Sequence, residues 1–547
     1  MSFPQNTLRF HWFLPRILLA STLILLSCSL KRRDNQSFIY CSEGSPSSFN
    51  PQIFTDGTSN NASSHTIFER LVAFKYGSVE IIPSLAESFD ISEDRLTYTF
   101  HLRKDVPFHA NDRFTPTRLF NSKDVLFSIN RMLNKDHPYH KVSGGSYEYF
   151  VAMGMNKAIR SLKAPDLHTV VMTLSSPDAS FLANLAMPFM SIHSQEYAEA
   201  LLKNKEQERI DQYPIGTGPF VFKNYSKDSV IRYKVNLDYW GEKPSLKRMA
   251  FSITTDASVR FQKLKTMECH FINSPSPADL EAIKREPHLK LEEGFGLNVG
   301  YLAMNTEKKP FNNPKVRRAI SLALNKKSYI KAIYLDQAIP AKNPLPPTIW
   351  SYHDELKELE YNPQKAKALL KEAGLPQGFS AELWTLPVSR PYNPNGKKMG
   401  EMMQADLRKV GIDIKLVSYE WPTYLKKTSQ GEHQMVQLGW SGDNGDPSNF
   451  LNVLLSCDGV TSGSNSARWC HPQFDQLLKD ALLTSDIKER TRLYKRAQEI
   501  FREELPWVPL AHSKVFRAMN KKVHGYKMDP LGGDIFRTIS LKKDSTQ

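Results

Sequence analysis

The chain has 547 residues, of which 40% are hydrophobic and 24% charged, so it is long enough for several domains and too polar for a protein with many membrane spans. Lys and Arg outnumber Asp and Glu by 72 to 57, but the excess is spread along the chain and no basic block exceeds Lys31-Arg32-Arg33, which argues against a nucleic-acid-binding surface. Five cysteines without a CxxC motif or a Cys/His cluster argue against structural zinc and iron–sulfur clusters, and we expect neither a metal site nor a cofactor.

The amino terminus has the pattern of an export signal. Arg9 and Arg16 precede an apolar run from 17 to 26, which is shorter than the roughly 20 residues needed to span a membrane. A short buried helix is the alternative interpretation of this run. The run ends in Leu25-Leu26-Ser27-Cys28, which resembles a bacterial lipobox. We therefore expect residues 1–28 to be a signal peptide and Cys28 to be diacylated, so that the mature protein touches a membrane only through this anchor.

The other four cysteines are Cys41, Cys269, Cys457 and Cys470. In an exported protein they lie in an oxidising compartment and are able to form two disulfides. Cys457 and Cys470 bracket a short Gly/Ser-rich stretch, so they are the natural local pair, and Cys41–Cys269 is the pair that remains. Buried free thiols are the alternative.

Helices and strands alternate in the first part of the chain. The segment 66–75 is amphipathic and predicts a helix, residues 96–103 alternate in the period of a strand, and residues 122–131 return to the helical pattern. Gly216-Thr217-Gly218 is too short to hold a phosphate and indicates a tight turn between domains.

The clearest pattern lies between 361 and 443. Asn362 can cap a helix over 364–373 that Gly374 ends. Further elements give a βαβαβ order, in which parallel strands share one sheet and ligands bind outside the strands' carboxyl ends. These elements are strands at about 379–386, 412–419 and 434–440 and helices at about 397–410 and 422–428.

Charged and aromatic side chains follow these strands. Ser389-Arg390, Glu420-Trp421 and Ser441-Gly442-Asp443 stand at the three carboxyl ends. Arg390 and Asp443 together suit a ligand with an anion at one end and a cation at the other, such as a short peptide with free termini. Trp421 and Tyr392 would wall its side-chain pockets. An internal Arg390–Asp443 salt bridge, or two unrelated surface charges, is the alternative that the pattern leaves open.

Two of these segments, Trp440–Pro447 and Arg390–Asn395, resemble the ligand motifs of the bacterial periplasmic dipeptide-binding proteins of ABC importers. In that family the arginine matching Arg390 binds the peptide carboxylate and the aspartate matching Asp443 binds the amino terminus. The resemblance also implies ligand contacts at Gly57, Thr58, Trp440, Ser441 and Gly442, and two disulfides at the four cysteines. It covers residues 38–540 and includes the segments 40–46, 85–88, 98–104, 141–150, 214–220, 296–301 and 341–348.

The resemblance implies an α/β protein with the two-lobed periplasmic-binding-protein fold, an extra subdomain and hinge closure over the ligand. It implies no enzymatic activity, and it names as partners a dipeptide and an ABC permease and ATPase complex in the inner membrane. The lipobox-like end is shared with the haem- or glutathione-binding lipoproteins of the same fold, so haem, glutathione and 5-aminolevulinate remain alternative ligands. The expected divisions are lobe I at 36–68, 217–295 and 514–542, the extra subdomain at 69–216, and the ligand-bearing lobe II at 296–513.

An exported hydrolase is the rival from another class. The sequence has no His-Glu-x-x-His motif and no phosphate-binding loop, and Gly144–Glu148 begins like a nucleophile elbow but lacks the closing glycine. The histidines, among them His65 and His433, are scattered and would act as ligands only if haem or a metal is bound. The sequence therefore favours a binding protein.

Overall fold

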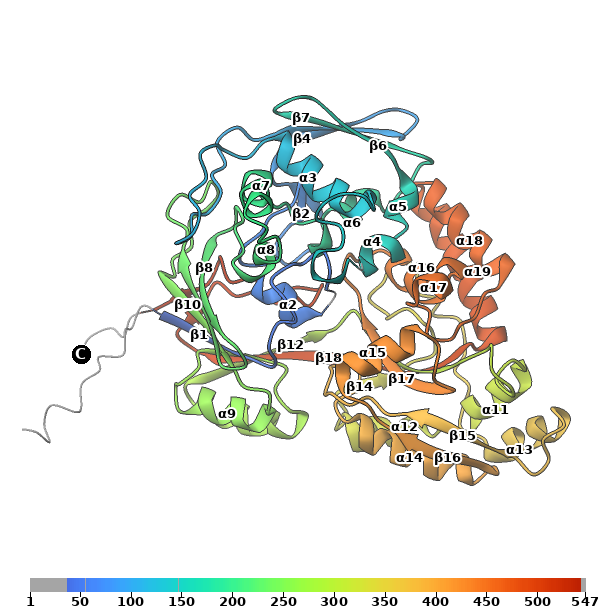
Figure 1. Ribbon diagram of the computed structural model, residues 1–547. Helices are drawn as coiled ribbons and strands as arrows, with labels where there is room; N and C mark the ends of the chain where they lie inside the picture. The colour runs from blue at the N-terminus through green and yellow to red at the C-terminus, as the bar shows by residue number, and fades with distance from the viewer. Residues whose placement is uncertain (1–36, 55, 146, 543–547) are drawn as a thin grey trace, which may run out of the picture.

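One long mixed sheet runs through the molecule (Figure 1). In this computed structural model, which describes residues 37–54, 56–145 and 147–542, twelve strands belong to that sheet. Its main path, in spatial order, is β16 (Ile412–Val417), β15 (Phe379–Trp384), β17 (Met435–Ser441), β13 (Asn298–Met304), β18 (Trp507–Asn520), β11 (Phe271–Asn273), β1 (Ser37–Ser42), β10 (Arg248–Ile253), β9 (Val230–Val235) and β8 (Phe220–Ser226), while β12 (Leu289–Phe295) and β14 (Ala338–Pro340) also pair with β18.

Strand β18 joins the two halves of this sheet. Its first residues pair with β13, and its last residues pair with β11 and β12. In Figure 1 it crosses the lower part of the molecule between the half that carries β1, β8 and β10 and the half that carries β15–β17. The boundary predicted at 513/514 therefore falls inside one continuous strand. The domain boundaries themselves stay predictions.

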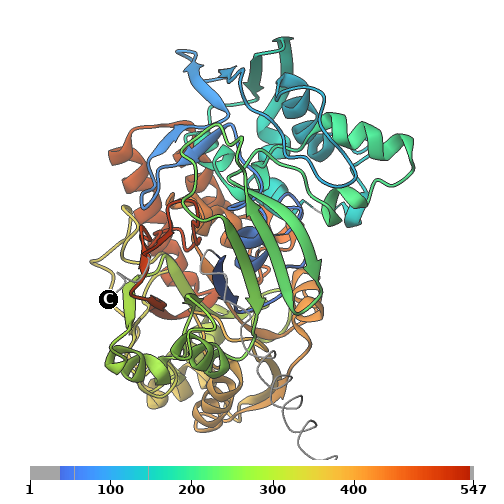
Figure 2. The same ribbon diagram turned by 90° about the vertical axis from the view of Figure 1, so that its left-hand side faces the viewer.

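A second, antiparallel sheet lies within the segment predicted as the extra subdomain. Its order is β4 (Ala86–Ile91), β5 (Thr97–Leu102), β7 (Thr169–Leu174) and β6 (Ile159–Asp166). Figure 2 shows this part of the chain, in blue and teal, at the top of the molecule. In the sequence, a hairpin of β2 (Val72–Phe74) and β3 (Ile81–Pro83) comes after β1 of the long sheet and before β4.

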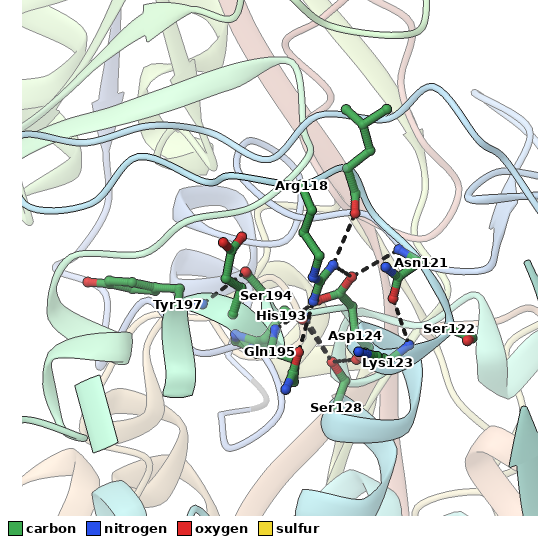
Figure 3. Close-up of polar contacts among 12 residues, drawn as sticks. Arg118, Asn121, Ser122, Lys123, Asp124, Ser128, His193, Ser194, Gln195 and Tyr197 are labelled. Carbon is green, nitrogen blue, oxygen red and sulfur yellow. Dashed lines mark hydrogen bonds and ion pairs between the residues drawn. The ribbon is translucent and has the colours of Figure 1, made fainter. Parts of the chain in front are cut away.

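Polar contacts fix the helices of this subdomain to each other (Figure 3). The carboxylate of Asp124, in α3 (Ser122–Leu133), is buried and accepts two hydrogen bonds from the Arg118 guanidinium, at 2.7 and 2.8 Å. It also accepts from the backbone N–H groups of Asn121 and Gln195, so it caps its own helix and holds the start of α7 (Gln195–Lys203). One buried carboxylate thus ties together three segments.

The remaining helices cover the sheets and connect their strands. They are α2 (Gly57–Ala62), α4 (Glu148–Ala152), α5 (Met155–Ala158), α6 (Phe181–Leu185), α8 (Arg209–Gln212), α9 (Ala257–Lys265), α10 (Leu280–Arg285), α11 (Pro314–Ala323), α12 (Lys326–Ile333), α13 (Pro363–Glu372), α14 (Gly396–Arg408), α15 (Trp421–Ser429), α16 (Ser448–Leu455), α17 (Cys457–Ser462), α18 (Pro472–Leu483) and α19 (Ile487–Glu504), with short 3-10 turns at Val142–Gly144, Pro188–Met190 and Pro277–Asp279, and a last small sheet of β19 (Val523–His524) and β20 (Ser540–Leu541).

The βαβαβ prediction is confirmed. The chain passes through α13, β15, α14, β16, α15 and β17 in that order, and β15 pairs in parallel with both β16 and β17. The Asn362 side chain caps α13 through the backbone N–H of Lys365, 2.9 Å away. The helix over 122–131 and the strand over 96–103 are confirmed as α3 and β5.

The helix predicted over 66–75 is wrong. The carbonyl oxygens of Thr66 and Ile67 accept hydrogen bonds from the backbone N–H groups of Phe220 and Gly218, and residues 72–74 form β2. These carbonyls are therefore unavailable for helical bonds. A Cβ atom at Gly216 or Gly218 would collide with the Ile67 backbone, which explains why this turn holds two glycines.

Both predicted disulfides are present. Cys41 in β1 is bonded to Cys269, with Cα atoms 5.8 Å apart, and Cys457 at the start of α17 is bonded to Cys470, with Cα atoms 4.6 Å apart. The signal peptide and Cys28 lie outside the described residues. Among the residues described, no helix is both long and apolar enough to cross a lipid bilayer.

Candidate functional site

A cavity of about 1340 Å³ opens at the carboxyl ends of β15 and β17. Residues 388–395 after β15, the start of α15 and the end of β17 form one part of its wall. Other parts come from distant segments, including the start of α2, the start of α4 and the loop before β20. Ligand sites in open α/β sheets lie at this edge, as the sequence predicts.

Arg390 is held in a tight turn after β15. Its backbone forms a two-way bridge with Asn393, with hydrogen bonds of 3.1 and 2.9 Å. Its half-buried guanidinium lies over the ring of Trp421, 5.0 Å from the ring centre. Burial raises the pKa of the Tyr392 phenol, and the charge of Arg390 beside it opposes that shift. The guanidinium is thus oriented by a π face, with donors left for an anion.

Asp443 is held in the loop after β17. The Tyr149 hydroxyl donates a hydrogen bond of 2.7 Å to Asp443 Oδ2, and the Asp443 backbone N–H donates to Asn449 Oδ1 at 2.9 Å. Burial raises the pKa of Asp443 to about 7, while the hydrogen bonds from Tyr149 and Asn449 act to lower it. The carboxyl group therefore titrates near neutral pH, and no cationic side chain of the described residues lies within 4.0 Å of it.

Trp440 and Tyr149 pack together beside this carboxylate. Their rings meet edge to face at 5.8 Å, and the Trp440 Nε1 group donates to Asn449 Oδ1 at 3.0 Å. Asn449 is fully buried and so serves both Trp440 and Asp443. The aromatic pair joins α4 to the end of β17 across the cavity wall.

The structure brings eight of the nine predicted ligand residues to the same cavity. Gly442 is the exception, because its backbone N–H donates to the carbonyl of Leu297 and the residue is buried away from the cavity lining. The eight lining residues are Gly57, Thr58, Arg390, Tyr392, Trp421, Trp440, Ser441 and Asp443.

Arg390 and Asp443 make no ion pair with each other within 4.0 Å, nor does either pair with another charged side chain of the described residues. The internal salt bridge that the sequence left open is therefore not formed. Two side chains of opposite charge type face one cavity, and neither has a charged partner in the part of the chain that the structure describes.

Sequence reasoning missed Tyr149 and Asn449. Tyr149 lies 294 positions from Asp443 in the sequence, within the segment 141–150 that carries part of the family resemblance. Nothing in the spacing of that segment points to a carboxylate. Asn449 stands six residues after Asp443, where a helix cap is the ordinary expectation.

Known proteins resemble most of the chain. The model of bacterial extracellular solute-binding proteins, family 5 middle part, matches residues 80–462. A dipeptide-binding protein of Escherichia coli K12 is 51% identical over 507 residues, which are 93% of this chain and 95% of that protein. A heme-binding protein A of Haemophilus influenzae is 46% identical, over 96% of this chain and 98% of that protein. The crystal structure of a dipeptide binding protein from Pseudoalteromonas sp. SM9913 in complex with Met-Leu superposes with a TM-score of 0.89 at 39% identity, covering 93% of this chain and 100% of that one.

Proposed function

The chain belongs to the bacterial extracellular solute-binding proteins, family 5, and from this premise we propose that it is the receptor of an ABC-type peptide importer, which captures dipeptides by their free termini and delivers them to a membrane permease. The observation that carries the proposal is the pair of opposite charges, Arg390 and Asp443, which face one cavity and have no charged partner among the described residues. A dipeptide supplies both missing partners.

Each end of the peptide has its own group. The planar Arg390 guanidinium binds the α-carboxylate as a two-pronged donor above Trp421, and Asp443 accepts from the α-ammonium beside Tyr149. Main-chain groups near Thr58 and Ser441 bind the peptide backbone, which adds affinity without selecting side chains. Trp421, Trp440 and Tyr392 wall the side-chain pockets.

The protein binds and releases its ligand without a chemical step. Lobes I and II, with the divisions expected from the sequence, close over the peptide, and the permease and ATPase complex in the inner membrane recognises the closed form. Binding then acts as a shift between two conformations.

The protein works outside the cytoplasm, in the periplasm, with Cys28 as its lipid anchor. Labelled palmitate is expected in the wild-type protein and absent from Cys28→Ser. A mature amino terminus found at another residue, without an acyl group, would instead show an ordinary cleaved signal.

Haem is the second candidate ligand, because one relative is named for haem. His65 lines the cavity, and burial lowers its pKa to about 3, so its imidazole is neutral and has the form that binds iron. An absorbance titration with haemin distinguishes haem from a dipeptide as the ligand. The dipeptide proposal expects no saturable change in the haem spectrum. If haem were the ligand, Arg390→Ala would leave haem binding nearly intact.

Blocked peptides test the dipeptide proposal directly. An N-acetylated or C-amidated dipeptide leaves Asp443 or Arg390 without its partner, and removing one partner of a buried charged pair costs about 2–5 kcal/mol, or roughly thirty-fold to several thousand-fold in affinity. Calorimetry of free and blocked dipeptides measures this loss. Asp443→Asn and Arg390→Ala are expected to lose free dipeptide by similar factors.

Crossing the two changes assigns each contact. An acetylated peptide is expected to lose less on Asp443→Asn than a free peptide does, because that contact is already absent. Equal binding of free and blocked peptides to the wild type would contradict the receptor for two free termini.

A further inference from the structure

Two more guanidinium groups, Arg70 and Arg537, line the same cavity. Arg70 lies just before β2, and Arg537 lies in the loop before β20. Both are half-buried, and neither has a carboxylate within 4.0 Å among the residues that the structure describes. Neither belongs to the segments after β15 and β17 that carry the proposed peptide-binding charges.

Glu69 is the acid that interacts with both, and its oxygens are already used. Its side chain is 8% exposed and accepts hydrogen bonds from Trp240 Nε1 at 2.6 Å, Tyr239 Oη at 2.8 Å and Thr217 Oγ1 at 2.9 Å. Burial raises the pKa of Glu69, against these hydrogen bonds and the charge of Arg537. The Glu69 carboxylate is therefore at most one negative charge facing the two guanidiniums, and its hydrogen bonds come from neutral donors.

The charge of Arg537 acts against the charge of Arg70, and Arg70 keeps one donor unused. Burial lowers the pKa of Arg70 to about 10, with Arg537 acting in the same direction and Glu69 against it. At neutral pH Arg70 thus remains charged. Its Nη1 group donates to Ser64 Oγ at 2.6 Å, while its buried Nε group has no partner. A bound anion would offset the repulsion between these two guanidinium groups and accept hydrogen bonds from them.

Other cations along the cavity wall have more bonding partners than Arg70 and Arg537. Arg517 forms an ion pair with Asp534 at 2.7 Å. Arg260 is 3% exposed and donates to the backbone carbonyl groups of Thr254, Thr255 and Ser274, although its Nε group has no partner. Lys514 lies 3.4 Å from Glu293. Arg70 and Arg537, like Arg390, differ from Arg517 and Lys514 because no carboxylate of the described residues lies within 4.0 Å of them.

We propose that Arg70 and Arg537 form a second anion-binding position in this cavity, which takes a carboxylate that the ligand carries in addition to its two termini. The receptor then favours peptides with an acidic side chain. The cavity of about 1340 Å³ exceeds the roughly 300–1,000 Å³ of ordinary small-molecule pockets, so it has room for a ligand that reaches more than one wall. This inference rests on the proposed function.

Pairs of peptides that differ only in charge test the proposal. The affinities of Ala-Glu and Glu-Ala are compared with those of Ala-Gln and Gln-Ala by calorimetry, with Ala-Ala as the neutral reference. Because a charge-assisted hydrogen bond is stronger than a neutral one, the wild type is expected to prefer the glutamate peptide over its glutamine isostere at one position by about tenfold or more.

Variants locate this preference. In Arg537→Gln the ratio of glutamate to glutamine affinity is expected to fall to about twofold or less, and Arg537→Lys is expected to keep part of it. Arg70→Gln is the second test of the same position. Lys398→Gln is the matched control, since Lys398 also lines the cavity but donates to the carbonyl of Ala332, and it is expected to leave the ratio unchanged.

The outcomes separate this inference from the proposed function. If Ala-Ala binds but the wild type does not distinguish glutamate from glutamine, the second anion position is wrong and the dipeptide receptor stands. A preference that survives both Arg537→Gln and Arg70→Gln also overturns it. If no dipeptide binds, both proposals fail.

Discussion

At Asp443, burial and hydrogen bonding oppose each other, and the result is a carboxyl pKa of about 7 in place of the ordinary 3.8. Because only the ionised carboxylate attracts an ammonium group, protonation competes with the ligand below that pH. The affinity for a free dipeptide is expected to fall on acidification by on the order of tenfold or more between pH 7.5 and pH 5. Calorimetry across this range measures the fall.

The Tyr149 hydroxyl shifts the same titration. Its hydrogen bond lowers the pKa of Asp443, so Tyr149→Phe, which keeps the ring against Trp440, is expected to move the midpoint of the affinity loss to higher pH. N-acetylated peptides serve as the control, since they do not use the carboxylate and should show no such midpoint. A flat profile, or a midpoint unmoved by the substitution, would contradict this account of Asp443.

The raised pKa of Asp443 also affects the stability of the folded protein. Its effect depends on pH in the opposite direction to that of a carboxylate with a lowered pKa. The folded protein binds the Asp443 proton more tightly than the unfolded chain does. This group's contribution to the free energy of unfolding is therefore fully present below about pH 4 and is lost as the pH rises through 7. Ligand binding offsets the loss by supplying a cation.

Individual site residues were predictable where charge and position agreed. Arg390 follows β15 and Asp443 follows β17 in a recognisable βαβαβ unit, so their place at the cavity was predictable, while the pattern left open whether they bind a ligand or each other. Tyr149, Arg70 and Arg537 were not, because they reach the cavity from segments whose distance to it depends on the whole fold. Local pattern carries no information about such contacts.

At the scale of elements, the Asp124 cluster should be a main source of stability for the extra subdomain. Asp124→Ala removes four hydrogen bonds and leaves Arg118, which is 25% exposed, without its partner. The expected loss is about 3 kcal/mol in the free energy of unfolding, measured by chemical denaturation. Lys75→Ala is the control, because it breaks an exposed pair with Glu80 and should change stability by less than about 0.5 kcal/mol.

The two disulfides differ in exposure and in loop length. Cys470 is exposed, whereas Cys41 and Cys269 are buried, so mild reductant is expected to open Cys457–Cys470 first, as peptide mapping with thiol labels would record. Cys41–Cys269 closes the longer loop, with a sequence separation of 228 against 13. Replacing each pair by alanine should cost about 2–4 kcal/mol, and more for the longer loop. A mapped Cys41–Cys457 link would contradict both expectations.

Elements were predictable where their signals are local. The region 361–443 contains its own helix caps, helix-ending glycines and hydrophobic periodicity. Its helices and strands begin and end within a few residues of the predicted positions. The segment 66–75 has the apolar period of a helix, yet the carbonyl groups of Thr66, Ile67, Glu69 and Arg70 are all bonded to other segments of the chain. Tertiary hydrogen bonding overrode the local pattern there.

At the scale of the whole molecule, the order of strands could not be read from local patterns. Neighbouring strands such as β13 and β18, or β1 and β11, come from distant parts of the sequence, and only the family resemblance anticipated two lobes with crossing chains. If the lobes divide as the sequence predicts, these crossings limit where the lobes are able to bend. Near the cavity, the crossings of the described chain include Gly296-Leu297, between β12 and β13, and the middle of β18.

Hydrogen bonds of Asn298 connect these two crossings. Asn298 Nδ2 donates to the carbonyl of Ser513, and the Ser513 backbone N–H donates back to Asn298 Oδ1, both at 3.0 Å. The Ser513 hydroxyl also donates to the carbonyl of Pro391, in the turn that holds Arg390. The predicted hinge is therefore hydrogen-bonded to the turn that holds Arg390.

Closure about these crossings should be visible in solution. Saturating free dipeptide is expected to reduce the radius of gyration measured by small-angle X-ray scattering, because the lobes move together over the ligand. The same concentration of a peptide blocked at both ends should leave the scattering unchanged, and so should free peptide added to the Arg390→Ala, Asp443→Asn double variant. A ligand shifts a conformational equilibrium only through contacts that differ between the two states.

Asn298→Ala removes the side-chain bonds to Ser513 without touching either charge. It is expected to broaden the distance distribution of the free protein, while free dipeptide still narrows it. If calorimetry shows tight binding but the wild-type scattering does not change, the lobes do not close and delivery to a permease must rely on another signal.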